Sequence, residues 1–210
     1  MRDPNNPCLF CNVPSSEYVF ENNLAFSTFD SYPVSKHHAL IIPKRHVENY
    51  FDMSEEEVQQ AVQTTIERCE ASIVAAQGTM LNGPIQGGIH RHLRKQSAQG
   101  MGQFDFAIHP IGGIVPIMEQ HRYKDLAKIM LATIGELPPE RPRHMFGCGH
   151  PMLFSMLIAL GADLFDSAAY ALFARDDRLL SPQGTYRLND LQAWHELVPC
   201  IVNWTPEKVR

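Results

Sequence analysis

The chain has 210 residues, of which 44% are hydrophobic and 20% charged, and its formal net charge is −5. These values indicate a folded globular protein of one large or two small domains and exclude general disorder. The acidic charge argues against a basic surface over the whole molecule. One local cluster is the candidate contact for nucleic acid, and it consists of His90, Arg91, His92, Arg94 and Lys95.

The five cysteines have no spacing typical of a disulfide framework, which predicts a reducing, cytoplasmic location. No apolar run reaches the roughly 20 residues that a membrane span needs. The first residues, MRDPNNP, lack the basic and then apolar pattern of a signal peptide. We therefore expect no membrane partner.

The first third of the chain predicts a small antiparallel sheet and one helix. Aromatic and aliphatic runs indicate strands at 18–20, 24–29 and 38–42. Ser54 followed by three glutamates predicts a helix start, and the apolar positions after it keep a helical period to about Val74.

From residue 80 onward the pattern alternates between strands and helices. The expected strands lie in MLNGPIQGG, FDFAIHPIGG, RPRHMFGCG and ADLFDSA, and the expected helices at 92–99, 123–135 and 151–161, with a helix or loop after the last strand. About four such units predict an α/β fold in the form of a partial (β/α) barrel, although spacing alone also allows a small open parallel sheet.

The ends of these strands carry the candidate site residues. They are Gln86, Gly112, Gly113 and Asp166, and in barrels of this type function lies at the carboxyl ends of the strands. Simpler interpretations exist for each of them. Asp166 is also a good cap for a following helix, and Gln86 with the glycines is also ordinary turn chemistry.

Four motifs at about residues 79–192 resemble the tRNA-guanine transglycosylases, and most closely their archaeosine-forming branch. The motifs are GPIQGGIHRHLRKQSA, FAIHPIGGIVPIMEQHRYKDL, RPRHMFGCGHPM and LGADLFDSAAYALFARDDRLLSPQGT. The resemblance implies exchange of guanine in tRNA for a 7-deazaguanine through a covalent glycosyl intermediate. It assigns the nucleophile to Asp166, purine recognition to Gln86, and close backbone approach to the base to Gly112 and Gly113.

The same resemblance implies that the site is incomplete on its own. The family's aspartate-serine-glycine motif, which supplies a general acid/base, has no counterpart before residue 79, and Asp105 and Asp163 are the nearest candidates for a second carboxylate. The family's CxCxxC zinc motif is reduced to Cys200. No cofactor is required for the chemistry. We expect tRNA or a guanine-type base as partner, and self-association or a complementing chain to complete the barrel.

Residues 8–57, from CLFC to FDMSEEE, resemble the first half of the histidine triad (HIT) proteins. This resemblance implies a ribose contact for Asp30 and zinc ligands at Cys8, Cys11 and His46. A thiol pair without metal is the alternative. The histidine motif that performs the chemistry of this superfamily is absent.

The expected organisation is a HIT-like segment at 1–57, a connecting helix at 58–78, and a transglycosylase-like partial barrel at 79–210. A tRNA-modifying transferase is the first hypothesis for its function. The alternatives are a non-catalytic base- or nucleotide-binding module, a HIT-type nucleotide-binding protein, and a recombined or truncated frame without an evolved function.

Overall fold

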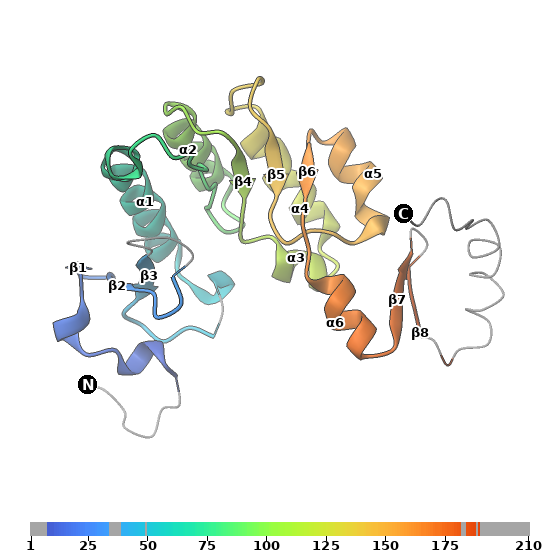
Figure 1. Cartoon of the computed structure of the whole chain (residues 1–210), viewed down its shortest axis with the longest axis horizontal. Helices are drawn as coiled ribbons and strands as arrows, with labels where there is room; N and C mark the ends of the chain where they lie inside the picture. The colour runs from blue at the N-terminus through green and yellow to red at the C-terminus, as the bar shows by residue number, and fades with distance from the viewer. Residues whose placement is uncertain (1–7, 34–38, 49, 182–183, 188, 190–210) are drawn as a thin grey trace.

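The computed structural model describes residues 8–33, 39–48, 50–181, 184–187 and 189. The elements follow one another in chain order from one end of the molecule to the other (Figure 1). An antiparallel sheet and a long helix come first, a parallel sheet with its helices forms the middle, and a two-stranded hairpin follows.

The first sheet has the antiparallel order β1-β2-β3. Its strands are β1 (Phe20–Glu21), β2 (Ala25–Phe29) and β3 (Ala39–Pro43), and the short 3-10 helices around it are η1 (Phe10–Asn12), η2 (Ser15–Glu17) and η3 (Tyr50–Asp52). Phe26 lies opposite Ile42 and both side chains are buried. The three predicted strands are present, with the first displaced toward Glu21, since Tyr18 is the C-cap of η2. His38 lies outside the described residues.

Helix α1 (Glu55–Ala76) begins where the sequence predicts. The Ser54 hydroxyl accepts the backbone N–H of Glu57, and the Glu57 carboxylate accepts the backbone N–H of Ser54 at 2.7 Å. Two further hydrogen bonds, of 3.1 and 2.7 Å, reach the same carboxylate from the Arg45 guanidinium. Glu57 therefore joins the end of β3 to the start of α1.

The charge of Glu57 gives a testable pH dependence. Hydrogen bonds from Arg45, and then from Ser54, lower the pKa of this carboxyl group. Its contribution to stability is therefore present above the unfolded pKa of about 4.3 and is lost as the pH falls through the lower folded pKa. We expect Glu57→Gln to reduce the free energy of unfolding at pH 7 by about 1 kcal/mol and to remove this part of the acid dependence.

Urea unfolding from pH 3 to pH 7 measures that effect. The exposed neighbour Glu56, changed to Gln, serves as the matched control. Equal curves for the two variants would show that the contact with Arg45 contributes no stability.

The second sheet is parallel and its strands lie in sequential order. It contains β4 (His109–Ile111), β5 (Arg143–Met145) and β6 (Leu164–Phe165). The helices of this region are α2 (Arg91–Gly102), α3 (Val115–Glu119), α4 (Tyr123–Ile134), α5 (Pro151–Ala159) and α6 (Ala169–Arg175). The hairpin strands β7 (Arg178–Ser181) and β8 (Gly184–Arg187) follow α6. Sequential parallel order is typical of (β/α) barrels, whereas doubly wound sheets reverse their order.

The first of the four predicted strands is only partly formed. Residues 80–88 form no regular strand and make only isolated parallel bridges with the next segment, at Asn82 with Ile108 and at Ile85 with Ile111. Pro84 between these bridges has no N–H to donate to a ladder. The segment still hydrogen-bonds beside β4, as in Ile85 N–H to the Pro110 carbonyl at 2.7 Å.

Two apolar clusters hold these elements together. The larger packs β4 and β5 against α4 and α5, and includes Ile111, Leu126, Met130, Met145 and Leu157. The smaller packs α1 and α2 against the 80–88 segment through residues such as Cys69, Ile85 and Met101. Cys69 and Cys148 are core residues. None of the helices within the described residues is long and apolar enough to span a membrane.

Candidate active site

Four of the predicted site residues lie at the carboxyl end of the parallel sheet. Gln86 follows the bridge at Ile85, Gly112 and Gly113 follow β4, and Asp166 follows β6. The backbone of Phe146, just after β5, donates to the Ile111 carbonyl at 3.3 Å and so ties two of these strand ends together. Gln86 and Asp166 therefore share one edge of the sheet, but their side chains make no direct contact.

Asp166 is exposed at this edge and is held by two hydrogen bonds. Its Oδ1 lies 2.8 Å from His144 Nε2 and accepts the backbone N–H of Gly147, also at 2.8 Å. Among the described residues no hydrogen bond reaches Oδ2. The simpler interpretation of Asp166 as a helix cap is wrong, because α6 begins three residues later and the Ser167 hydroxyl accepts the Ala169 N–H instead.

His144 was not predicted as a site residue. It lies on β5 beside β6, paired in register with Leu164, so its ring reaches Asp166 across the two strands. The sequence places the two residues 22 positions apart, and only the parallel register brings them together. His150 caps α5 through Nδ1, which accepts the Met152 N–H at 3.3 Å.

A cleft of about 880 Å³ opens beside Asp166. Gly147 and Ser167, the neighbours of Asp166 in space and in sequence, form part of its wall. The remaining wall comes from α3, α5, α6 and the hairpin and is mostly apolar, with residues such as Met118, Leu172 and Phe173. Burial lowers the pKa of His150 in this wall and so favours its neutral form.

Gln86, Gly112 and Gly113 lie at another part of the same sheet edge, where a buried arginine holds their loops in place. Arg94 is fully buried and donates to four carbonyls, those of Ile85, Gly88, Gly112 and Gly113. Burial lowers the pKa of its guanidinium to about 10, which still leaves it charged at neutral pH.

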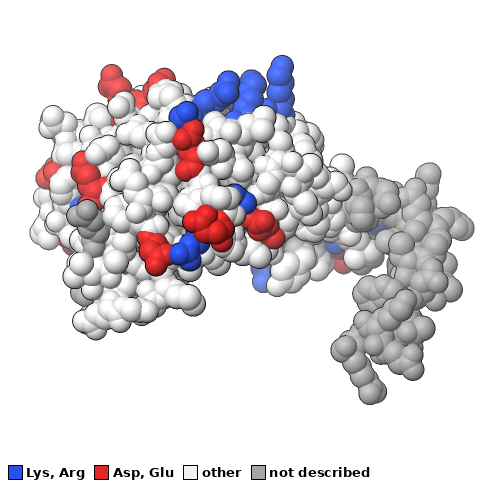
Figure 2. All heavy atoms as spheres, turned by 90° about the horizontal axis from the view of Figure 1, so that it is seen from above, with Lys and Arg blue, Asp and Glu red and all other residues white. Residues whose placement is uncertain are grey.

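The predicted basic cluster at 90–95 is therefore only partly present. Arg94 points inward, because α2 turns this position toward the loops at 85–88 and 112–113, here called the glycine loops. His90 and His92 lie 3.4 and 3.0 Å from Glu55, and Lys95 pairs with Glu136 at 2.7 Å. Lys and Arg side chains do gather along one edge of the molecule, while acidic side chains occupy other parts of the same view (Figure 2).

The two candidates for a second carboxylate lie at the wrong edge of the sheet. Asp163 precedes β6 and accepts the Arg143 N–H at 2.8 Å, at the amino end of β5. Asp105 precedes β4 and pairs with Arg141. The expectation that either assists Asp166 is wrong, because the length of the strands separates them.

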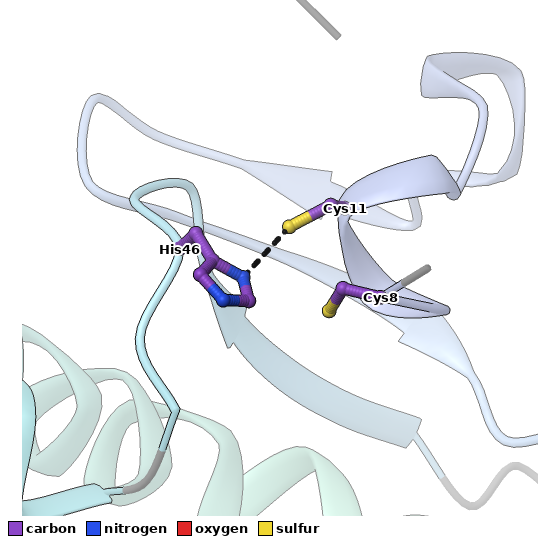
Figure 3. A group of neighbouring side chains, drawn as sticks. All are labelled: Cys8, Cys11 and His46. Carbon is purple, nitrogen blue, oxygen red and sulfur yellow. Dashed lines mark hydrogen bonds between the residues drawn. The ribbon is translucent and has the colours of Figure 1, made fainter. Parts of the chain in front are cut away.

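The predicted metal ligands do come together in the N-terminal segment. One ligand atom each from Cys8, Cys11 and His46 lies within 4.8 Å of the other two, and the three side chains point toward one another (Figure 3). Cys11 Sγ lies 3.2 Å from His46 Nδ1. A backbone hydrogen bond from Cys11 lowers the pKa of the Cys8 thiol, which favours the thiolate that binds metal.

Asp30 lies apart from this group, after β2. Its Oδ1 accepts the backbone N–H of Tyr32 at 3.0 Å and so closes a local turn. The ribose contact implied for Asp30 stays a prediction. Cys200 lies outside the described residues.

A parallel sheet in sequential order, with an exposed carboxylate and glycine-containing loops at its carboxyl edge, defines an α/β protein and is compatible with a (β/α) barrel. The sequence profile of the queuine tRNA-ribosyltransferase family matches residues 41–203. The chain therefore belongs to this family, whose fold is a (β/α) barrel. The match begins within β3, so it extends upstream of the segment at 79–192 that carries the motifs.

Curated relatives agree with this assignment. The tRNA-guanine(15) transglycosylase of Methanothermobacter thermautotrophicus is 45% identical over 148 residues, which are 70% of this chain and 23% of the relative. The enzyme of the same name from Pyrococcus furiosus is 43% identical over 159 residues, 76% of this chain and 27% of the relative. The chain thus spans about a quarter of the length of these relatives. The resemblance of residues 8–57 to the histidine triad proteins stays a prediction.

Proposed function

We propose that this protein takes part in base exchange in tRNA, replacing guanine by a 7-deazaguanine. The observation that carries the proposal is the exposed Asp166 carboxylate, whose Oδ1 is held by His144 and Gly147. Membership of the family and the printed names of the relatives support tRNA and guanine as the substrate class. The test is incorporation of labelled guanine into tRNA by the wild-type protein and by Asp166→Asn.

The proposed reaction has two displacements at the ribose C1′. Asp166 Oδ2 attacks C1′ and forms a glycosyl ester, while the bond from C1′ to N9 of guanine breaks and guanine leaves with the electron pair, to be protonated. N9 of the incoming base then attacks C1′, loses its proton, and releases the carboxylate. This is the sequence that retaining glycosidases follow. His144 and Gly147 keep Oδ1 in place, so Oδ2 faces the substrate.

Base recognition falls to the glycine loops in this proposal. Among the described residues the side-chain amide of Gln86 has no hydrogen bond, so it is available for the purine edge, while the backbone N–H of Gln86 is fixed by the Ser97 hydroxyl at 3.1 Å. In this proposal a flat base approaches the backbone of Gly112 and Gly113, whose Cβ positions face the Ile85 carbonyl and the Tyr50 ring. The target nucleotide has to leave its stack to reach these loops.

We also propose that the site is completed by a second copy or by a complementing chain. The general acid that assists departure of guanine is then supplied from outside the described residues, in which Asp105 and Asp163 are misplaced. Within the described part of the chain, β6 pairs with β5 alone and leaves an open sheet edge. Exposed apolar side chains lie near this end, namely Phe146, Leu164, Tyr170 and Leu172.

A second candidate is a base-binding module without exchange activity. The rigid glycine loops favour it, because Arg94 fixes them independently of Asp166. Guanine binding without exchange would identify this function. A HIT-type nucleotide-binding function would instead depend on Asp30. The cytoplasmic location of the protein stays a prediction.

We further propose that Cys8, Cys11 and His46 hold a structural zinc ion. Two thiolates and an imidazole are typical zinc ligands, and their spacing suits one tetrahedral ion with a fourth ligand from water or another residue. The ion would supply a cross-link between the chain before β1 and the end of β3. It takes no part in the proposed chemistry.

We expect the purified protein to contain about one zinc ion per chain and Cys11→Ser to contain almost none. The loss should lower the melting temperature by roughly 5 °C or more, because the cross-link is lost with the metal. Plasma mass spectrometry and thermal unfolding measure the two effects. His92→Gln, at an exposed histidine outside the group, is the control. Equal metal contents in the wild type and Cys11→Ser would contradict the proposed site.

A further inference from the structure

Arg94 is a buried charge whose hydrogen bonds all go to backbone carbonyls. Its side chain is fully buried, and Nε donates to Gly88 at 2.8 Å while Nη1 donates to Gly112 at 2.8 Å. Nη1 also donates to the Ile85 carbonyl and Nη2 to the Gly113 carbonyl, each at the longer distance of 3.4 Å. Among the described residues no carboxylate pairs with it. One guanidinium thus joins the loop at 85–88 to the loop at 112–113.

Packing alone does not explain an arginine at this position. A buried charge costs several kcal/mol of desolvation, and an apolar side chain of similar volume often serves the stability of a core equally well. The planar fork of the guanidinium can, however, fix several acceptors at set distances and angles, which no aliphatic side chain can do. The geometry of the two loops is therefore the property that Arg94 determines.

Tyr50 of η3 contacts the same two loops. Its hydroxyl accepts the backbone N–H of Gly87 at 3.2 Å. A Cβ placed on Gly88 or Gly113 would lie 3.7 or 3.5 Å from the Tyr50 ring, so the ring packs against both glycines. Tyr50 and Arg94 together hold the loop at 85–88 against the loop at 112–113.

We propose that Arg94, assisted by Tyr50, is the positioning residue that sets the spacing of the two base-binding loops. It keeps the loop that carries Gln86 at a fixed distance from the glycine pair, next to the direct bond from Gly112 N–H to the Ile85 carbonyl at 3.0 Å, and so sets the affinity for a flat purine such as guanine. Arg94 acts through the backbone and touches no reacting atom. This inference rests on the proposed function, because it assigns these two loops to the binding of guanine.

The test compares Arg94→Lys with Tyr50→Phe in the full chain. Lysine keeps the charge but cannot bond four carbonyls, and phenylalanine keeps the ring but loses the bond to Gly87. We expect Arg94→Lys to raise the KM and Kd for guanine by roughly 10- to 100-fold, as a misplacement of about 1 Å does, with a kcat within about threefold of the wild type. Tyr50→Phe should raise both the KM and the Kd by about threefold and still fold, since it loses a single hydrogen bond.

Hydrogen exchange at the amides of 85–88 and 112–113 provides a readout that does not depend on guanine. Reduced protection in both loops together, in either variant, is expected. Folded variants with unchanged protection and an unchanged KM would overturn the inference. A wild-type protein that neither binds nor exchanges guanine would instead overturn the proposed function. The loop exchange data would then still decide whether Arg94 couples the loops.

Discussion

Replacement of Asp166 by asparagine is expected to abolish guanine exchange. The variant keeps the size of the side chain and an oxygen for the hydrogen bonds from His144 and Gly147, but it loses the negative charge that attacks C1′. Loss of a nucleophile of this kind reduces the rate by about 10³-fold or more. Incorporation of labelled guanine into unmodified tRNA measures the effect. The wild-type rate itself should be slow, because the general acid is not part of the described site.

Asp163→Asn is the matched control. This carboxylate precedes the same strand, is also exposed, and binds the backbone of Arg143 at the opposite edge of the sheet. It should therefore exchange guanine at close to the wild-type rate. Equal exchange by the wild type and Asp166→Asn would show that another group is the nucleophile.

The largest expected loss of stability comes from Gly87→Ala. Gly87 has a φ of +133°, and a Cβ there would lie 2.6 Å from the Arg94 backbone nitrogen and 2.8 Å from the Leu93 carbonyl carbon. These are backbone atoms of α2 and cannot turn away. Strain of about 1–3 kcal/mol from the conformation, together with a similar cost from overpacking, predicts a total loss of roughly 2–5 kcal/mol.

Gly135→Ala separates this effect from the general one of adding a methyl group. Gly135 ends α4 with a φ of −66°, and nothing lies within 4 Å of a Cβ built on it. Its stability should change by less than about 0.5 kcal/mol. Urea denaturation of both variants makes the comparison. A Gly87→Ala protein as stable as Gly135→Ala would mean that the loop at 85–88 does not approach α2 so closely.

Local patterns were sufficient to predict most elements of the fold. Ser54 and Glu57 are a capping pair within four residues, and the helical period after them needs no distant partner, so the start of α1 could be read directly. The parallel strands were found because each ends in glycine or polar residues. The first of them was overpredicted, since Pro84 stops a continuous ladder that the apolar pattern alone suggests.

The sequence predicted site residues only where they belong to a recognisable motif. Asp166 could be placed at a strand end from its own neighbourhood, and the structure agrees with that location. Its contact with His144 depends on the register of two strands, which the sequence does not specify. Arg94 lies in a run of basic residues and so suggested a surface patch, although its position on the inner face of α2 buries it. A tertiary contact between residues far apart in the chain, such as the bond from Gly87 N–H to the Tyr50 hydroxyl, cannot be predicted from the local sequence.

The most direct test of the proposed chemistry is to locate the covalent intermediate. The wild-type protein would be mixed with tRNA, denatured in mid-reaction, and digested with nuclease and protease before tandem mass spectrometry. We predict a ribosyl adduct on the peptide that contains Asp166, with fragment masses that assign it to Asp166 and not to Asp163. An adduct on a different residue, or active exchange without any adduct, would contradict the assignment of Asp166 as the nucleophile.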